Sequence, residues 1–448
     1  MNTDQLMRNI LKELVGKSGA ENLKIIKINV NNLSKYGELS FPTNILAWKS
    51  LIEFDKYIEI TKNKTNILEI YLKINNINKE NCSDNQIITE ALNLLISNSK
   101  CWPVSLQSGF IHKEKICLRL NRLSVISTAI KIAIKYNHEY GRTSGTDVNK
   151  QSGKTVYLEV NEDPESNLTT SRLRLLKSIS ENIFNLQGYD VQISESNNDK
   201  IDFKYLLTTK SKNEFKEKYI SYSCGVVKNL DTNSKETLLT YDAYLQKKIQ
   251  NIVDLNECRE LENENQQLEN YKSIAKAIIT FEFFSVKPNH PVIIAENPEA
   301  DKRVISNKGG AFVLYNQTRI SSILDKFDKE CINGKYPALW NIDDIDLDIL
   351  NLEEEWELIY NFIFGYPMIV SNSIEFKLHH ELCPQVICSF LSHLSKKFSI
   401  YYRRYRILTE GCTHLLPTLM ARIYLLKALQ IVYNNSLNIL NINSISRM

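Results

Sequence analysis

Basic and aromatic side chains are interleaved in the segment 396–406, which reads KKFSIYYRRYR. Lysine and arginine neutralise phosphate groups, and tyrosine rings offer flat surfaces on which unpaired bases stack. This combination is the chemistry of binding to single-stranded RNA. The candidate residues are Lys396, Lys397, Tyr401, Tyr402, Arg403, Arg404, Tyr405 and Arg406.

The same region predicts the helix that must position these side chains. Apolar residues recur at intervals of four and three and define one buried stripe: Ile387, Leu391, Leu394, Phe398, Tyr401 and Tyr405. The lysines and arginines lie off this stripe and should face solvent. A solvated charged face is the ordinary meaning of such a run, so RNA binding is one of two interpretations. Tyr401 and Tyr405 fit the core as well as a stacking surface.

The local charge supports the RNA interpretation. Residues 375–448 contain nine basic and three acidic residues, although the whole chain has a net charge of only +3. A basic face must therefore be local. Arg422 and Lys427 join the candidate phosphate contacts. Eight carboxylates between 341 and 359 instead predict a solvated loop and helix start, without the glycine turn of a calcium loop.

A second polar group lies in the segment 307–327, where a glycine pair opens a predicted helix with a buried apolar stripe. Tyr315, Asn316, Gln317 and Arg319 occupy its first turns. An entirely structural helix would not need these groups. We therefore treat Tyr315 and Arg319 as candidate binding residues and helix capping or packing as the alternative.

The rest of the chain predicts several domains. Residues 156–160, an amphipathic helix through Leu173, Leu176, Ile179, Ile183 and Leu186, and residues 190–193 form a strand, helix, strand unit typical of a parallel sheet. We expect an N-terminal α/β domain of unknown role over 1–138, a linker over 139–155, a nucleotide-binding type of fold over 156–300 and a helical domain over 301–448.

Nine scattered cysteines indicate reduced thiols and a cytoplasmic location. The N-terminus lacks the apolar centre of a signal peptide, and we find no run of roughly 20 apolar residues, so we expect no membrane contact. No metal site is expected, because His379, His380, Cys383 and Cys388 match no standard zinc spacing. We also find no cluster of residues suited to catalysis.

The segments FSIYYRRYRIL (398–408) and LMARIYLLKALQIVYNNSLNILNINSISRM (419–448) resemble the arginyl-tRNA synthetase family, whose helical C-terminal module is the DALR anticodon-binding domain. The resemblance implies a degenerate Rossmann-like class I synthetase core followed by an all-α DALR bundle. Tyr315 and Arg319 lie on matching family positions, where they would line the domain junction and the approach of tRNA. The namesake Asp-Ala-Leu-Arg is Lys-Ala-Leu-Gln here, at 427–430.

The ATP-binding signatures of that family are missing. Its His-x-Gly-His motif falls on Asn167, Leu168, Thr169 and Thr170, and its lysine-rich loop is reduced to residues 233–236, with Lys235 beside Glu236. Neither replacement can stabilise the charge of an adenylation transition state. The resemblance therefore implies a protein that is not an enzyme and holds no cofactor.

Such a chain resembles the DALR anticodon-binding domain-containing protein 3 family. That resemblance implies an adaptor that binds arginine tRNAs and presents them to a methyltransferase-like enzyme for 3-methylcytidine formation in the anticodon loop. S-adenosylmethionine would be held only by the partner, since VNEDPESN (160–167) replaces a glycine-rich loop after the first strand. The alternatives are a protein–protein scaffold that does not read RNA and, less favoured, an active arginyl-tRNA synthetase.

Overall fold

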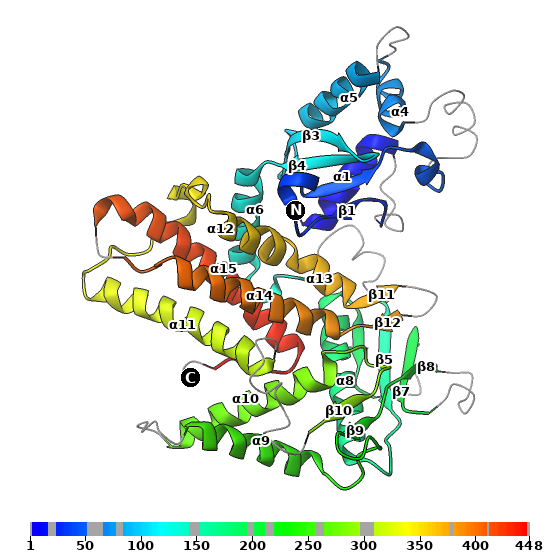
Figure 1. The fold of residues 1–448 in the computed structure, drawn as a ribbon, viewed down its shortest axis with the longest axis vertical. Helices are drawn as coiled ribbons and strands as arrows, with labels where there is room; N and C mark the ends of the chain where they lie inside the picture. The colour runs from blue at the N-terminus through cyan, green and yellow to red at the C-terminus, as the bar shows by residue number, and fades with distance from the viewer. Residues whose placement is uncertain are drawn as a thin grey trace. The chain divides into compact units, whose positions relative to one another are not determined.

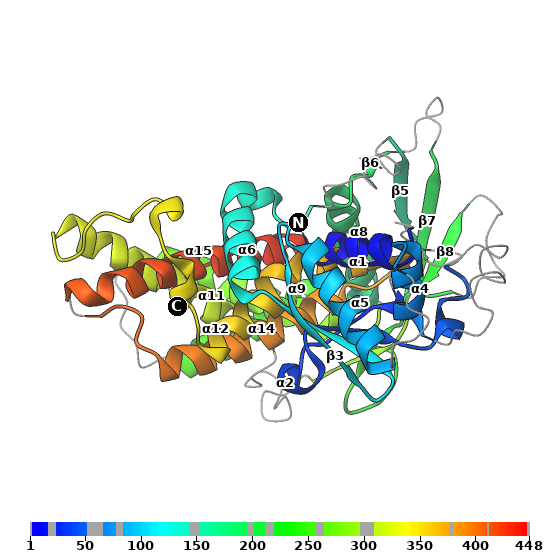
Figure 2. The same ribbon diagram turned by 90° about the horizontal axis from the view of Figure 1, so that it is seen from above.

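The computed structural model describes residues 2–16, 24–51, 66–77, 84–142, 153–194, 201–210, 219–256, 264–295, 309–376, 380–409 and 412–445 (Figures 1 and 2). The chain divides into two compact units. Unit 1 comprises Met1–Ile132 and Leu350–Gly365, and unit 2 comprises Ala133–Ile349 and Tyr366–Met448.

Unit 1 is built on an antiparallel sheet of order β1-β2-β4-β3, formed by Lys27–Ile28, Leu39–Pro42, Lys115–Leu120 and Leu106–His112. Ile116, Leu118 and Leu120 share one buried face of β4, and Cys117 on the opposite face is buried as well. The helices of this unit are α1 (Thr3–Val15), α2 (Leu33–Tyr36), α4 (Ile67–Ile74) and α5 (Asp84–Ser99). Helix α6 (Arg122–Tyr136) begins here and continues into unit 2.

The segment 350–365 belongs to unit 1, although the sequence analysis grouped it with the C-terminal helical domain. It contains α12 (Glu353–Glu357) and a π-helix over Leu358–Phe364. The hydroxyl of Tyr360 donates to the carbonyl of Glu38 at 2.9 Å, and Thr3 donates to the carbonyl of Phe364 at 3.2 Å. Tertiary packing therefore joins this segment to residues that are more than 300 positions away in sequence.

The carboxylates of this region are not all solvated, which corrects one expectation. Glu355 is fully buried and accepts a hydrogen bond from the backbone of Leu352 at 3.3 Å, as the third residue of a capped helix does. Glu353 pairs with Arg122 at 2.7 Å.

Unit 2 contains a parallel sheet of order β6-β5-β7-β8, from Asp190–Gln192, Thr155–Val160, Phe203–Thr208 and Ile220–Ser223. Helix α8 (Asn167–Leu186) connects β5 to β6, so the predicted strand, helix, strand unit is confirmed. A second parallel pair joins β9 (Val227–Asn229) to β10 (Val292–Ile294). Helices α9 (Tyr241–Asn256) and α10 (Glu264–Phe284) lie between these two strands in sequence.

The helical part of unit 2 consists of α11 (Gly310–Ile332), α13 (Tyr366–Asn372), α14 (Gln385–Arg404) and α15 (Leu416–Ile439). Helices α11, α14 and α15 run beside one another (Figures 1 and 2). A side chain at Gly310 would collide with the carbonyl of Ala277, so the glycine permits close packing of α11 on α10. A hairpin of β11 (Ile374–Phe376) and β12 (His380–Leu382) interrupts the expected all-α bundle.

Residues Thr413–Ile439, which include α15, are long and apolar enough to cross a membrane by length and composition, contrary to the expectation that no segment would be. Many side chains of α15, such as Leu425, Leu429 and Val432, are fully buried within unit 2. This burial is typical of a core helix. Most of the predicted linker (143–152) and the predicted domain boundary at residue 300 lie outside the described residues. Arg447 and Met448 at the C-terminus lie outside them as well.

Candidate functional site

Two tyrosines and an arginine form a layered cluster where α11 meets α14. The guanidinium carbon of Arg319 lies 4.5 Å from the ring centroid of Tyr315 and 4.5 Å from that of Tyr402. Arg319 also donates a hydrogen bond to the hydroxyl of Tyr315. Tyr315 is 45% exposed and Tyr402 38% exposed. The cluster therefore presents two aromatic rings, held by a cation between them, to an incoming ligand.

The other two polar residues in the first turns of this helix, Asn316 and Gln317, are buried. Asn316 is fully buried, and its Nδ2 donates to the carbonyl of Phe312 at 2.8 Å. Gln317 is 2% exposed and contacts Ser321. The four polar residues of the predicted helix thus separate into the exposed Tyr315 with the half-buried Arg319, and a buried pair.

The candidate basic residues of α14 lie at its surface, as the periodicity predicts. Lys396, Arg403 and Arg404 are exposed, and Lys397 is half-buried. The Nε of Arg403 donates to the carbonyl of Ser399 at 3.2 Å, which leaves much of its guanidinium for other ligands.

The two basic residues of α15, Arg422 and Lys427, are more enclosed than Arg406, which precedes the helix. Arg422 is half-buried, lies over the ring of Tyr405 at 5.8 Å, and donates to the carbonyl of Arg406 at 3.4 Å. Arg406 is exposed, and its Nε donates to the carbonyl of Leu408 at 3.1 Å. Lys427 is half-buried.

The two candidate tyrosines of α14 and Tyr405, which directly follows the helix, have different environments. Tyr401 is fully buried, with its ring 5.4 Å from that of Tyr405, so it belongs to the core stripe and we remove it from the candidate stacking residues. Tyr405 is half-buried beneath Arg422. Only Tyr402 of this group is exposed, because it lies off the apolar stripe.

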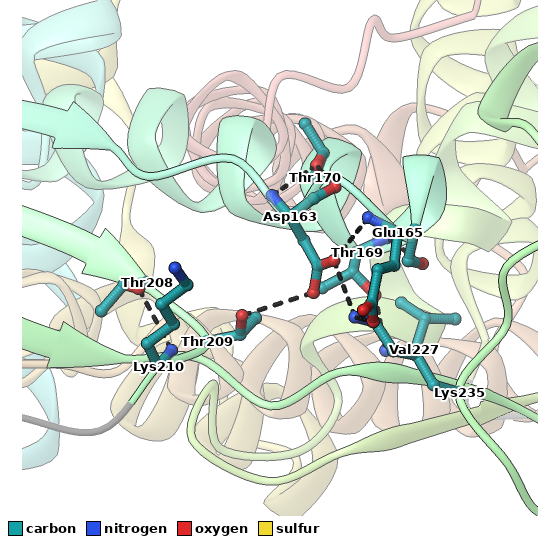
Figure 3. Close-up of polar contacts among 10 residues, drawn as sticks. Asp163, Glu165, Thr169, Thr170, Thr208, Thr209, Lys210, Val227 and Lys235 are labelled. Carbon is teal, nitrogen blue, oxygen red and sulfur yellow. Dashed lines mark hydrogen bonds and ion pairs between the residues drawn. The ribbon is translucent and has the colours of Figure 1, made fainter. Parts of the chain in front are cut away.

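A second polar cluster lies at the N-terminus of α8, beside the carboxyl ends of β5 and β7 and the first residue of β9, Val227 (Figure 3). The Nζ of Lys235 lies 2.7 Å from Oδ1 of Asp163 and 2.8 Å from Oε2 of Glu165. Asp163 also accepts hydrogen bonds from the backbone of Glu165 at 3.0 Å and from the hydroxyl of Thr209 at 3.4 Å.

The positions aligned with the ATP signature are engaged in contacts within the protein. The hydroxyl of Thr169 accepts from the backbone of Val227 at 3.1 Å, and that of Thr170 accepts from the backbone of Asp163 at 2.9 Å (Figure 3). Asn167 accepts from the backbone of Tyr241 at 2.8 Å. These groups tie the start of α8 to neighbouring loops.

The ion pair is electrostatically favourable. Burial opposes ionisation of Asp163, but the hydrogen bond from Lys235 and that from the backbone of Glu165 outweigh it and lower the pKa of Asp163. Burial likewise opposes the charge of Lys235, and its bonds to Asp163 and Glu165 outweigh that effect and raise its pKa. Both groups are charged at neutral pH.

Helix N-termini at the carboxyl edge of a parallel sheet are common binding sites for phosphate. Here the protein's own Asp163, of which the side chain is 4% exposed, lies at that edge and is neutralised by Lys235. The side chain of Ser166 caps the helix by accepting from the backbone of Thr169 at 3.2 Å. An incoming phosphate would meet a carboxylate and a lysine that is already paired.

The sequence analysis missed the role of Asp163 and Glu165. Their segment, VNEDPESN, was considered only for the absence of a glycine-rich loop. The available signal was a pair of carboxylates directly after a buried strand, since the ends of parallel strands converge on one edge of the sheet.

The fold and these two clusters define a class of protein: a parallel α/β core with an ion pair at the carboxyl edge of its sheet, joined to a helical domain with an exposed basic and aromatic surface. Residues 313–448 match the family model of the DALR anticodon binding domain. The helical surface described above falls inside this match.

The sequence of the chain is similar to those of DALR anticodon-binding domain-containing protein 3 and of arginine–tRNA ligases. It is 30% identical to the former from Danio rerio over 182 residues, which are 39% of this chain and 32% of that protein. It is 28% identical to arginine–tRNA ligase of Lactobacillus johnsonii over 211 residues, 46% of this chain and 33% of the ligase. These matches span about a third of the length of each relative.

The fold is also shared with a solved structure. Arginyl-tRNA synthetase of Thermus thermophilus superposes with a TM-score of 0.59 and 10% identity, covering 100% of both chains. This agreement confirms the expected architecture of a synthetase-like core with a helical DALR domain.

Proposed function

We propose that the protein is a non-catalytic tRNA-binding adaptor. The observation that carries the proposal is the cluster of Tyr315, Arg319 and Tyr402, which combines two exposed aromatic rings with a fixed cation on the matched DALR domain. Bases of an anticodon loop would stack on the rings. The exposed Arg403 and Arg404 of the neighbouring α14 would contact phosphates.

The proposed specificity is for arginine tRNAs, in keeping with the relatives named arginine–tRNA ligase. In this proposal the adaptor acts in the cytoplasm and presents the anticodon loop to a methyltransferase-like enzyme that forms 3-methylcytidine. The partner enzyme would supply S-adenosylmethionine. This part of the proposal comes from the resemblance stated above.

The arrangement at the start of α8 supports the absence of catalysis. Adenylation requires groups that stabilise the charge developing on the phosphates of ATP. Asp163 would repel those phosphates, and Lys235 is already paired with two carboxylates. We expect no arginine-dependent exchange of pyrophosphate into ATP, and measurable exchange would contradict the proposal.

The alternative of a scaffold that does not read RNA rested partly on the acidic segment 341–359. Two carboxylates of that segment are used inside unit 1, where Glu353 pairs with Arg122 and Glu355 is buried. They are therefore less suited to recruit a partner. The aspartates Asp344, Asp346 and Asp348 of the segment are exposed and are the part of it that a scaffold would use.

The test is the affinity of the purified protein for arginine tRNAs against other tRNAs of equal charge, at one fixed salt concentration. Competitors are needed because phosphate contacts alone give substantial affinity. A preference for arginine tRNAs supports the adaptor, and 3-methylcytidine in cells lacking the protein would then be measured. Equally weak binding of all tRNAs contradicts it and favours the scaffold.

A further inference from the structure

A polar pocket of about 480 Å³ lies between α10, α11, α15 and residues 443–445. Its volume falls in the range of roughly 300–1,000 Å³ that small-ligand sites occupy. The pocket is entirely within unit 2 and is separate from the cluster of Tyr315, Arg319 and Tyr402.

The described lining is rich in hydrogen-bond acceptors. It includes the carboxylates of Glu269 and Asp325, several carboxamides and hydroxyls, and no lysine or arginine. Glu269 pairs with Lys272 at 2.7 Å, whereas Asp325 has no ion pair among the described residues. The charge on this wall disfavours phosphates and carboxylates as ligands.

Gln317 provides a second, independent observation. It lines the pocket, is 2% exposed, and its Nε2 donates to Ser321 Oγ at 3.2 Å and to Asn434 Oδ1 at 3.4 Å. Its Oε1 is buried without a hydrogen-bond partner among the residues that the structure describes. Gln430 also donates to Ser321 Oγ, at 3.0 Å. Gln317 Oε1 is thus an acceptor in a lining residue that no described donor reaches.

Gln317, Ser321 and Asp325 follow one another at intervals of four and form one row along α11. A position two residues away on a helix is rotated by about 200°. Gln317 and Ser321 therefore face away from Tyr315 and Arg319. A ligand in the pocket would not compete with RNA on the proposed binding surface.

We propose that this pocket binds a guanidinium or primary ammonium group. A guanidinium carries five N–H donors and no acceptor, and its planar edge matches a carboxylate such as that of Asp325. The group belongs either to a free organic cation or to an arginine or lysine side chain of a protein partner. This inference goes beyond the proposed function and does not depend on it.

The test uses the full chain and three probes, titrated by isothermal calorimetry and by NMR. Arginine blocked at both ends stands for a side chain in a protein, and identically blocked citrulline is its uncharged counterpart. Agmatine stands for a free organic cation. We expect the two cations to bind and citrulline to bind at least about tenfold more weakly, because it has lost the positive charge.

Asp325→Asn keeps the size of the side chain and removes its charge. We expect this variant to weaken binding of blocked arginine roughly fivefold. Asp328→Asn is the matched control, since Asp328 is exposed on the same helix and does not line the pocket. Tighter binding of blocked arginine than of agmatine identifies a protein side chain as the ligand, and the reverse order identifies a free cation.

Binding of tRNA by Asp325→Asn is measured in parallel and should not weaken. If the protein without substitutions does not bind tRNA, the proposed function is contradicted, and the result for the pocket still stands. Equal binding of arginine and citrulline, no binding of any probe, or equal effects of Asp325→Asn and Asp328→Asn would overturn the pocket proposal.

Discussion

The guanidinium of Arg319 lies over the ring of Tyr402, with its carbon 4.5 Å from the ring centroid. Arg319 comes from α11 and Tyr402 from α14, so the contact depends on the packing of two helices. The same guanidinium carbon lies 4.5 Å from the ring centroid of Tyr315, which is on α11 like Arg319.

Replacing Tyr402 by alanine should weaken binding of arginine tRNA. Stacking of a base on an aromatic side chain contributes about 1–3 kcal/mol, so we expect the Kd to rise by roughly tenfold or more. Tyr401→Phe is the control, because Tyr401 is the adjacent residue and is fully buried. Competition binding measures both, and equal losses would show that the ring of Tyr402 does not contact RNA.

The double substitution Arg403→Glu with Arg404→Glu should reduce both affinity and its dependence on salt. Each phosphate contact that is lost reduces the magnitude of the negative slope of log K against log salt by about 0.7–0.9. For two contacts we therefore expect the magnitude of the slope to decrease by roughly 1.5. The same charge change at the exposed Lys276 and Lys329, outside the proposed surface, serves as the control. An unchanged slope in the arginine variant would remove this face from the interface.

Asp163→Asn should destabilise unit 2 at neutral pH by roughly 1–3 kcal/mol, because Lys235 loses the negative charge of its buried partner. Glu165→Gln is the milder comparison, since the side chain of Glu165 is 72% exposed. Thermal unfolding measures both variants. A larger effect of Glu165→Gln would contradict the assignment of Asp163 as the main partner.

The same pair predicts a pH dependence. The pKa of Asp163 is lowered by folding, so its stabilisation is present above the unfolded value of 3.8 and is lost as pH falls through the folded value. The pKa of Lys235 is raised, so its part is present below 10.5 and is lost as pH rises through the folded value. The difference in melting temperature between the native protein and Asp163→Asn should therefore persist at neutral pH and shrink in acid below about pH 4.

Arg172 offers a test of the core. It is fully buried on α8 and donates to the carbonyls of Phe283, Gly225 and His290 at distances between 2.6 and 3.2 Å. Arg172→Ala would leave these carbonyls without their donor and should cost roughly 3 kcal/mol or more. Burial lowers the pKa of Arg172, and the guanidinium still remains charged.

Arg174→Ala is the matched control for that experiment. Arg174 lies on the same helix and pairs with Glu162, but both side chains are more than half exposed. Exposed pairs contribute about 0–1 kcal/mol. Chemical denaturation gives both free energies of unfolding, and similar values for the two variants would mean that the three carbonyls find other donors.

Much of the architecture could be predicted from local patterns. The apolar stripe of α14 is buried at Ile387, Leu391, Leu394 and Phe398, and the unit of β5, α8 and β6 is parallel. These features follow from the 3.6-residue period of a helix and from the connection between adjacent strands, which are encoded within a short length of chain.

The local pattern placed Tyr401 on the buried stripe while keeping it as a stacking candidate, and the structure buries it and exposes Tyr402. It also placed residues 350–365 with the wrong neighbours and treated Glu355 as solvated, although that side chain is fully buried. Which elements cover a helix depends on packing across the whole unit, and a sequence window does not contain that information.

The sequence by itself determined that α14 has a buried apolar face and a basic exposed face, because residues three and four apart share a side of a helix. Only the tertiary structure placed Arg319 over Tyr402 and paired Lys235 with Asp163, 72 residues away. Such contacts require separate elements to pack at one particular distance and orientation, and the free energy that selects this packing comes from many apolar contacts distributed along the chain.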